Sequence, residues 1–335
     1  MTNLIESIKT GFASKKVLII GDIVADQYLN GTISRVSREA PVFILRHDET
    51  TTLPGAAANA AANVASLGGT PILIGAIGSD LNGELLRGSL STRGVDLSSV
   101  VIGDSIKTTT KLRVLAGGQH AVHQQVIRID YENRSEFPAD VQQKMIENIA
   151  AADVSADAII ISDYNYGVAD STVFAAAMEC SRKRGIPLVV DSRFRLAEFQ
   201  GATAATPNQE EAEQLLGINY DSRSVEELRE RFGYEALLIT NGNKGMRLYE
   251  SGRPFSQIDA VGSLDPVDVT GAGDTVIAAF ALGLASGISF VDSARLANHA
   301  GGLVVMKKGT ATVSTTELIN SIENEAKARA SNPNV

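Results

Sequence analysis

Short runs of almost wholly apolar residues alternate with helix-sized segments along most of the chain. The runs cover residues 17–20, 71–76, 158–161, 187–190 and 236–239. A strand that is apolar along its whole length is buried on both faces, which is typical of a parallel sheet covered by helices on both sides. The sequence therefore predicts an α/β fold with an open, mostly parallel sheet, and 335 residues are enough for one large domain of this kind.

Segments between the apolar runs have the spacing of amphipathic helices. They cover residues 57–67, 81–93, 138–152, 171–184, 209–216 and 225–232, and the end of the chain is expected to be helical at 272–285, 290–306 and 315–328. Two regions, at about residues 33–52 and 98–131, have strand character without a helix between their strands. We therefore expect a single domain over residues 1–330 that carries a small antiparallel β lid, followed by a frayed tail at 331–335.

The charge and the cysteine content exclude several kinds of protein. The chain has 30 lysines and arginines against 39 aspartates and glutamates, a net charge of −9, whereas nucleic acids and anionic membranes are bound by basic surfaces. Cys180 is the single cysteine, so no internal disulfide can form. The longest apolar run, residues 276–285, is far shorter than the ~20 residues of a membrane span. We therefore expect a cytoplasmic protein with no nucleic-acid or membrane partner.

The most informative stretch, residues 268–275, reads Asp-Val-Thr-Gly-Ala-Gly-Asp-Thr and leads directly into an apolar helix. The small residues Gly271, Ala272 and Gly273 let a ligand approach the backbone at a helix N-terminus, where free amides and the helix dipole attract an anion. Asp274 lies in the same turn and can take a proton from a hydroxyl group. Phosphoryl transfer to an alcohol requires both features, although a glycine-rich helix start also occurs as an ordinary N-cap.

This stretch resembles the C-terminal signature of the ribokinase-like (phosphofructokinase-B type) carbohydrate kinases. Residues 21–26 and 54–59 resemble further motifs of that family in the expected order, and the resemblance covers essentially the whole chain. Within the family, the sequence is similar to the D-glycero-β-D-manno-heptose-7-phosphate kinases, including the kinase half of bifunctional heptose kinase/adenylyltransferases. That likeness is carried by residues 34–42, 110–115, 161–164, 206–208 and 268–277. It implies a ribokinase-like sheet with a β lid.

The resemblance also implies roles for individual residues. Asp274 would be the general base, and Gly271, Ala272 and Gly273 would form the anion hole. The sugar would be held by Asp22, Asp26, Gly55, Asn59 and Asp163. ATP would be bound by Asn208, Gln209, Glu210, Glu211, Thr240, Gly242, Gly245 and Asn298, with Mg²⁺ held through water by Asn208 and Glu211. Members of the family can also bind a monovalent cation such as K⁺, here near Asp268 and Thr270. Asn208 and Glu211 are equally compatible with a simple helix start, and Gly242 with a turn.

Five cations fall in the predicted lid of this acidic protein, namely Arg35, Arg38, Lys111, Arg113 and Arg128. Guanidinium groups suit phosphate because they donate hydrogen bonds in pairs. We therefore expect a substrate that already carries a phosphate, held by Arg35, Lys111 and Arg113, whereas others of the five are compatible with solvated charges at a strand edge. A lid of this kind exposes an apolar face, so we also expect a homodimer formed through the lid.

Three departures from the heptose kinase pattern leave the sugar open. Ala56 stands where that family has glycine, residues 191–193 read Asp-Ser-Arg instead of Asp-Pro-Lys, and residues 165–167 read Asn-Tyr-Gly instead of Ala-Lys-Gly. The first hypothesis is transfer of the ATP γ-phosphoryl group to O1 of D-glycero-β-D-manno-heptose 7-phosphate, a step towards ADP-heptose for lipopolysaccharide core. The alternatives are a kinase for another free or phosphorylated sugar and a sensor that binds without turnover. Turnover that depends on Asp274 would separate an enzyme from a sensor.

Overall fold

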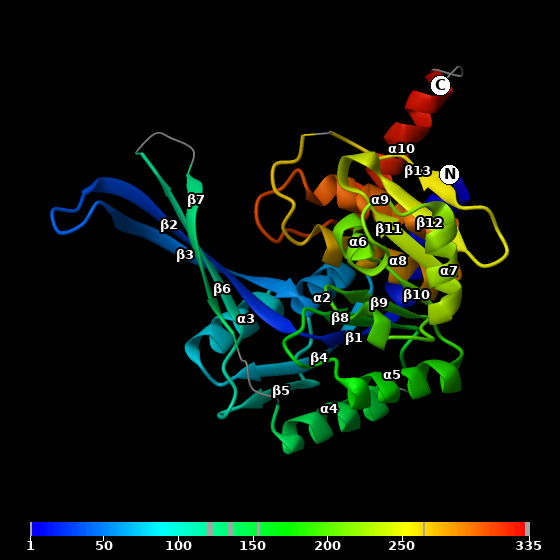
Figure 1. The fold of residues 1–335 in the computed structure, drawn as a ribbon, viewed down its shortest axis with the longest axis horizontal. Coiled ribbons are helices and arrows are strands. Elements are labelled where there is room, and N and C mark those ends of the chain that lie inside the picture. Colours follow the sequence, from blue (N-terminus) through cyan, green and yellow to red (C-terminus); the bar gives the residue numbers. More distant parts are fainter. Residues whose placement is uncertain (1, 119–122, 133–136, 153–154, 264, 332–335) are drawn as a thin grey trace.

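A large, mostly parallel β-sheet forms the centre of the protein. The computed structural model describes residues 2–118, 123–132, 137–152, 155–263 and 265–331. In this part of the chain the sheet has nine strands in the order β13-β12-β11-β10-β9-β8-β1-β4-β5 (Figure 1). The strands are β1 (Lys16–Gly21), β4 (Thr70–Gly78), β5 (Val100–Gly103), β8 (Ala158–Asp163), β9 (Leu188–Ser192), β10 (Ala204–Ala205), β11 (Ala236–Thr240), β12 (Met246–Glu250) and β13 (Ser256–Ile258).

The predicted parallel sheet is confirmed. All pairs from β5 to β11 are parallel, and β12 and β13 extend the sheet in antiparallel fashion. Alternate residues of β1 face opposite cores: Val17 and Ile19 belong to one buried cluster, and Leu18 and Ile20 to the other. Burial on both faces explains why these strands are apolar along their length. β10, β12 and β13 were not predicted, because they are short or contain polar residues.

Helices cover both faces of the sheet. One core includes residues of α1, α2, α3, α8, α9 and α10, and the other includes residues of α4, α5, α6 and α7. Their bounds are α1 (Thr2–Gly11), α2 (Ala57–Ser66), α3 (Leu81–Ser91), α4 (Ala139–Ala152), α5 (Ser171–Arg184), α6 (Gln209–Leu216), α7 (Ser222–Phe232), α8 (Ala272–Ala285), α9 (Phe290–Val304) and α10 (Thr315–Ser331). None of the helices described here combines the length and the apolar character needed to cross a membrane.

The boundaries of the expected helices lie within three residues of the predicted ones. α7 begins three residues before the expected start because the Asp221 side chain accepts a hydrogen bond from the Ser224 amide and caps the helix. α1 was not predicted. α10 continues to Ser331, the first residue of the expected frayed tail, and the rest of that tail lies outside the described residues.

The lid is a separate sheet of four strands that extends away from the main body (Figure 1). Its order is β3-β2-β6-β7, with β2 (Ile23–Val36), β3 (Phe43–Ala56), β6 (Thr110–Gly117) and β7 (Gln124–Tyr131). The expected lid segment 98–131 begins too early, because β5 pairs with β4 in the main sheet. The expected segment 33–52 begins too late, because β2 starts directly after β1 and runs without a turn into the lid. The sequence also predicts a glycine-containing turn at residues 117–120 between two strands of the lid, and this turn lies partly outside the described residues.

Ala56 joins the lid to α2 in a backbone conformation that favours glycine. Its φ of 54° and ψ of −130° place it outside the regions that residues with a Cβ normally adopt. The residue is buried and lines the cavity described below. A strained, non-glycine residue at such a position costs about 1–3 kcal/mol and persists only where the surrounding structure holds it.

We predict that Ala56→Gly leaves the free energy of unfolding within about 1 kcal/mol of the wild type, because relief of strain offsets the lost methyl group and the extra chain entropy. Ala61→Gly is the matched control, since Ala61 is equally buried but lies inside α2. The Ala61→Gly variant relieves no strain, and its free energy of unfolding is expected to fall by about 2 kcal/mol. Urea unfolding of both variants checks this, and equal losses would show that Ala56 is not strained.

Candidate active site

A polar cavity (the main cavity) lies where the carboxyl ends of the parallel strands meet the base of the lid. Its volume is about 550 Å³, a usual size for a small-molecule site. Its wall includes residues from the ends of β8, β9 and β11, namely Asp163, Asp191 and Thr240. Lys111 and Arg113 of β6 line it from the lid. In open α/β sheets ligands bind at this edge, because the loops that follow the strands diverge there.

The N-terminus of α8 opens into this cavity. Gly271, its N-cap, has a φ of 77°, and a Cβ on it would lie 2.4 Å from Asn59 Nδ2, so only glycine fits. The N-cap forms no side-chain hydrogen bond, and Gly271, Ala272 and Gly273 all line the cavity. The Ala272 amide donates to the Val269 carbonyl oxygen at 3.2 Å. The helix dipole therefore points its positive end at the cavity, with Gly273 in the first turn.

Asp274 lies in this first turn with its carboxylate held on both sides. Asn59 Nδ2 donates to Asp274 Oδ2 at 2.8 Å, and Tyr164 Oη donates to Asp274 Oδ1 at 2.9 Å. Burial raises the pKa of Asp274 from an ordinary 3.8 to about 7, although both hydrogen bonds act in the opposite direction. A carboxyl group with a pKa near 7 is half ionised at neutral pH and is suited to act as a general base.

Four cations line the cavity, three from lid strands and one from the loop after β9. Lys111, Arg113, Arg128 and Arg193 all line it. Arg113 pairs with Asp26, and Arg128 pairs with Asp130. Within the described residues, Lys111 and Arg193 form no ion pair, and Lys111 Nζ lies 5.1 Å from the centre of the Tyr164 ring. Their charges are therefore available to an anionic ligand.

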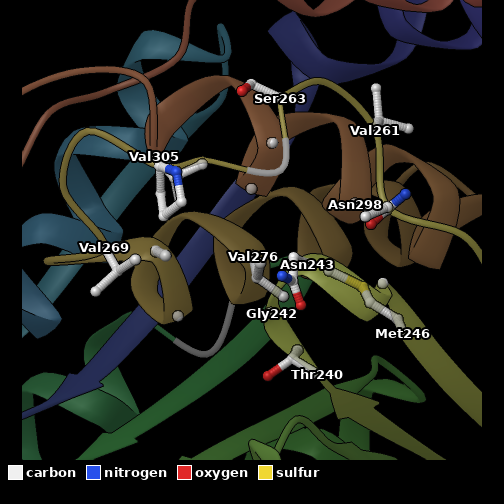
Figure 2. A pocket seen from close by; sticks show the side chains of 17 residues that line it. Thr240, Gly242, Asn243, Met246, Val261, Ser263, Val269, Val276, Asn298 and Val305 are labelled. Atoms are coloured by element: carbon white, nitrogen blue, oxygen red, sulfur yellow. The ribbon is translucent and has the colours of Figure 1, made fainter.

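A second, mostly apolar pocket of about 160 Å³ adjoins the first one and shares Thr240, Val269, Ala272 and Gly273 with it. Figure 2 shows Val269 and Val305 towards one end of this pocket and Asn298 and Met246 towards the other. Gly242, Asn243 and Gly245 form the turn after β11 on its wall. The shared residues bring the two pockets together at the N-terminus of α8.

Oxygen donors of the main body line another part of the main cavity. Asp191, Thr206, Asn208 and Glu211 line this part. Burial, followed by the charge of Glu211, raises the pKa of Asp191, and burial also raises the pKa of Glu211. Thr206 Oγ1 is buried, with no hydrogen-bond partner in the described part of the chain. Two buried carboxyl groups with raised pKa values and a hydroxyl without a partner among the described residues fit a cation such as Mg²⁺.

This donor set does not enclose a metal ion. Asn208 and Glu211 also form the capping box of α6: Asn208 Oδ1 accepts from the Glu211 amide, and Glu211 Oε2 accepts from the Asn208 amide. Among the described residues, no group of three or more histidine, cysteine, aspartate or glutamate side chains is arranged to hold a metal. These residues therefore suit a hydrated Mg²⁺ that a bound phosphate helps to hold, since Mg²⁺ keeps several of its waters.

Comparison with known families agrees with this geometry. The family model described as pfkB family carbohydrate kinase matches residues 14–317. The chain belongs to the pfkB family of carbohydrate kinases. It is therefore a sugar kinase, a phosphotransferase with an alcohol group as acceptor. The expected ribokinase-like fold is confirmed as well, because similar structures extend over nearly the whole chain.

Two relatives and two solved structures show how far the likeness extends. The bifunctional protein HldE of Geobacter sulfurreducens is 38% identical over 324 residues, and that of Caulobacter vibrioides is 36% identical over 325. Both alignments cover 95% of this chain, and the chain spans 65% of the length of those relatives. The ribokinase of Arabidopsis thaliana complexed with ribose and ATP has a TM-score of 0.69 at 21% identity, covering 93% of this chain and 99% of that one. Phosphofructokinase-2 of Escherichia coli in complex with potassium has a TM-score of 0.74 at 18% identity, with the same coverage.

Four of the expected sugar ligands of this pfkB kinase have protein partners instead of facing the cavity freely. The Asp22 carboxylate accepts hydrogen bonds from the amides of Tyr164, Tyr166 and Val168, and it does not line the cavity. Asp163 lies in the wall, but Ser192 and Arg195 donate to its oxygens. Asn59 donates to Asp274, and Gly55 packs against Asp26, because a Cβ on Gly55 would lie 2.4 Å from Asp26 Oδ2. Asp163 and Asp26 both line the cavity, although Asp26 is paired with Arg113, whereas Asp22, Gly55 and Asn59 do not line it.

The remaining expected residues divide in a similar way. Arg35 is exposed near the far end of β2 and does not line the cavity, so the structure does not bring it together with Lys111 and Arg113. Gln209 donates to Glu213 and lines a separate small pocket. Glu210 lies on the main cavity, and Thr240, Gly242, Gly245 and Asn298 surround the apolar pocket. Their roles in binding ATP stay predictions.

Sequence reasoning missed Tyr164 and Arg193 as residues of the site, and it placed Asp191 at the ligand-binding edge without giving it a role. Asp191 directly follows an apolar run, and a polar residue at the end of such a run is expected at the ligand-binding edge. Arg193 was recognised only as a departure from the family pattern. No signal in the sequence predicts that the Tyr164 hydroxyl reaches Asp274, because these residues lie 110 positions apart in the chain.

We predict that Asp274→Asn stabilises the free enzyme at pH 8 but not at pH 4. The pKa of Asp274 is about 7 when folded and near its ordinary 3.8 when unfolded, so its favourable contribution is complete below pH 3.8 and is lost as the pH rises through 7. This difference in pKa corresponds to about 4 kcal/mol at most, and we expect a gain of about 2–4 kcal/mol at pH 8.

Urea unfolding at both pH values measures this gain. Asp140→Asn, at an exposed position in the first turn of α4, is the control and should change stability little at either pH. If Asp274→Asn destabilised the protein at pH 8, the Asp274 carboxylate would have to be favourably solvated in the free enzyme.

Proposed function

We propose that this pfkB kinase transfers the γ-phosphoryl group of ATP to a sugar that already carries a phosphate. The observation that supports this best is the group of cations that line the cavity, of which Lys111 and Arg193 have no ion-pair partner among the described residues. In a chain with a net charge of −9, such a group favours an anionic ligand. In its most specific form, the proposal names O1 of D-glycero-β-D-manno-heptose 7-phosphate as the acceptor oxygen. The five segments that resemble heptose kinases support this form.

In this proposal the two pockets bind different parts of the phosphoryl donor and the acceptor. The apolar pocket suits the adenine ring, and the main cavity suits the sugar and the triphosphate, so the transferred phosphoryl group would lie at the N-terminus of α8 that both share. The acceptor hydroxyl loses its proton to Asp274 as its oxygen bonds to the γ-phosphorus, and the bond from that phosphorus to ADP breaks. The first-turn amides and the nearby cations stabilise the charge that develops on the phosphoryl oxygens.

Two ions belong to the proposal. Mg²⁺ would be held through water by Asn208 and Glu211, with Asp191 nearby, and when bound it supplies positive charge to the phosphates of ATP. A monovalent cation such as K⁺ would bind near Asp268 and Thr270. The Asp268 carboxylate already accepts from the amides of Thr270 and Gly309 at 2.9 Å, which holds the loops around this place together.

The relatives support the kinase proposal without defining the whole activity. The proteins named HldE are described as bifunctional, and this chain spans 65% of their length. We therefore propose the kinase activity alone for the residues present here. The alternative substrate is another sugar or sugar phosphate. The observation that favours it is Ala56, which lines the cavity at a position where the heptose kinase pattern has glycine.

A homodimer through the lid is also proposed. Large apolar side chains are exposed on the lid strands and in the turn between β2 and β3, namely Val36, Val42, Phe43, Val126, Ile127 and Ile129. Apolar side chains exposed on one small sheet favour association, and a second copy of the same lid offers a matching surface.

We predict that a panel of sugars and sugar phosphates, incubated with ATP and Mg²⁺, will show the highest kcat/KM for a phosphorylated sugar. Heptose 7-phosphate, the free heptose, fructose 6-phosphate and ribose form the core of the panel, and phosphorus NMR locates the new phosphate. The same assay in potassium and in sodium salts tests the monovalent cation. Equal kcat/KM values for free and phosphorylated sugars would contradict the proposal.

We predict that Lys111→Met raises the KM for the sugar phosphate about tenfold or more, because a hydrogen bond between charged groups is lost. The KM for ATP should change little, since Lys111 lies on the lid side of the cavity. Arg46→Gln is the control: Arg46 is a cation of the lid strand β3 with 68% of its side chain exposed. If both variants had the same KM for the sugar phosphate, Lys111 would not bind it.

We predict that Phe43→Asp weakens self-association at least tenfold, measured by sedimentation velocity over a concentration series, because it places a charge in the apolar surface of the lid. Phe43 is 61% exposed and Ile218, outside the lid, is 81% exposed, so Ile218→Asp is the control for a charge at an exposed apolar position. Loss of self-association in both variants, or in neither, would contradict assembly through the lid.

A further inference from the structure

The general base is held by a hydroxyl group that the proposed reaction does not itself require. Asp274 Oδ1 accepts a hydrogen bond from Tyr164 Oη at 2.9 Å, and its other oxygen accepts from Asn59 Nδ2 at 2.8 Å. An aspartate side chain can rotate about two bonds, and only one of its oxygens can face a bound acceptor hydroxyl. Donors on both sides restrict this rotation and fix the direction in which the remaining lone pairs point.

The loop that carries Tyr164 is itself held rigidly. Tyr164 directly follows β8, and the buried Asp22 carboxylate accepts from the amides of Tyr164, Tyr166 and Val168 at 2.8, 3.0 and 3.1 Å. The preceding residue, Asp163, is fixed by Ser192 and Arg195. These contacts hold the phenol against Asp274 without help from a ligand.

The lid also reaches the Tyr164 ring. Lys111 Nζ of β6 lies 5.1 Å from the centre of that ring and 5.5 Å from the centre of the Tyr166 ring. A lysine at this distance from a ring is attracted to its face. Tyr164 therefore touches the proposed base with its hydroxyl and a cation of the lid with its ring.

We propose that Tyr164 is a positioning residue for catalysis, which orients the Asp274 carboxylate and favours its charged form through the hydrogen bond from its hydroxyl group. The proposal rests on the proposed role of Asp274 as the base. In the reaction the acceptor O–H bond breaks and its proton goes to Asp274, the acceptor oxygen bonds to the γ-phosphorus, and ADP leaves with the electrons of the broken bond. Tyr164 keeps its own proton throughout, so it acts through Asp274 and does not touch the reacting atoms.

Two features of the site support a donor that never ionises. Burial, followed by the negative charge of Asp274, raises the pKa of Tyr164 well above its ordinary value. The hydroxyl therefore stays protonated whenever Asp274 is ionised. Three further titratable groups face Asp274, namely Asp26 of β2, Lys111 of β6 and Asp191 of β9. The two carboxylates oppose the ionisation of Asp274, whereas Lys111 favours it.

A pair of tyrosine variants in one loop tests the proposal. Tyr164→Phe removes the donor to Asp274 and keeps the ring beside Lys111. Tyr166→Phe is the matched control, because its ring lies beside the same lysine but its hydroxyl contacts Glu132 at 3.4 Å. We expect Tyr164→Phe to lower kcat about tenfold or more with less than about twofold change in the sugar KM, as for loss of a hydrogen bond to a charged group. The acidic limb of its kcat/KM profile should move to higher pH, and Tyr166→Phe should match the wild type.

A second measurement needs no substrate. Titration of the Asp274 side-chain carboxyl signal by carbon NMR in the free, full-length protein should give a higher pKa in Tyr164→Phe than in the wild type and in Tyr166→Phe. Unchanged titration with unchanged kcat in Tyr164→Phe would overturn the proposal. If instead Asp274→Asn turned over sugar as fast as the wild type, the proposed base would be wrong, whatever the tyrosine variants showed.

Discussion

The arrangement of the whole site depends on a buried carboxylate at the N-terminus of a helix. Asp274 is buried, with the donors Asn59 from α2 and Tyr164 from the loop after β8 on either side. Burying this charge reduces stability at neutral pH, as its raised pKa shows, and the helix dipole and the hydrogen bonds offset only part of the loss. A group that destabilises the free protein and opens into a cavity is typical of a catalytic residue.

The fold brings this carboxylate together with residues from distant parts of the chain. Parallel strands end at one edge of the sheet, so the loops after β8, β9 and β11 all reach the same cavity as the N-terminus of α8. The lid adds a second layer from the opposite side, since β2 and β6 carry Asp26, Lys111 and Arg113 over the cavity. These lid strands thus contribute Asp26 together with two cations, whereas Asp191, Glu211 and Asp274 come from the main body.

Much of this could be predicted from the sequence, because the relevant signals are local. The apolar runs predicted the strands buried on both faces, and the glycine-rich turn before Asp274 predicted the start of α8 at Ala272. The lid was only partly predicted: β2 combines buried residues near the sheet with exposed ones further out, so it has no single pattern. β5 was assigned to the lid because it has strand character without a neighbouring helix.

The partners of polar side chains could not be predicted from the sequence. Asp22 and Asn59 belong to motifs that resemble sugar-binding ones, yet Asp22 holds the loop of Tyr164 and Asn59 holds the Asp274 carboxylate. Arg35 has the right charge for a phosphate, but the length of β2 places it beyond the cavity. Such outcomes depend on distances across the fold, which a residue's type and its position in a motif do not contain.

The most direct test of this account is the single-turnover rate of Asp274→Asn with saturating ATP, Mg²⁺ and the best sugar substrate. A general base contributes about a hundredfold to ten-thousandfold to the rate, so we expect a loss of that size with the affinity for ATP unchanged. A rate within about threefold of the wild type would contradict the account, because a base worth less than that is below the range expected of general-base catalysis.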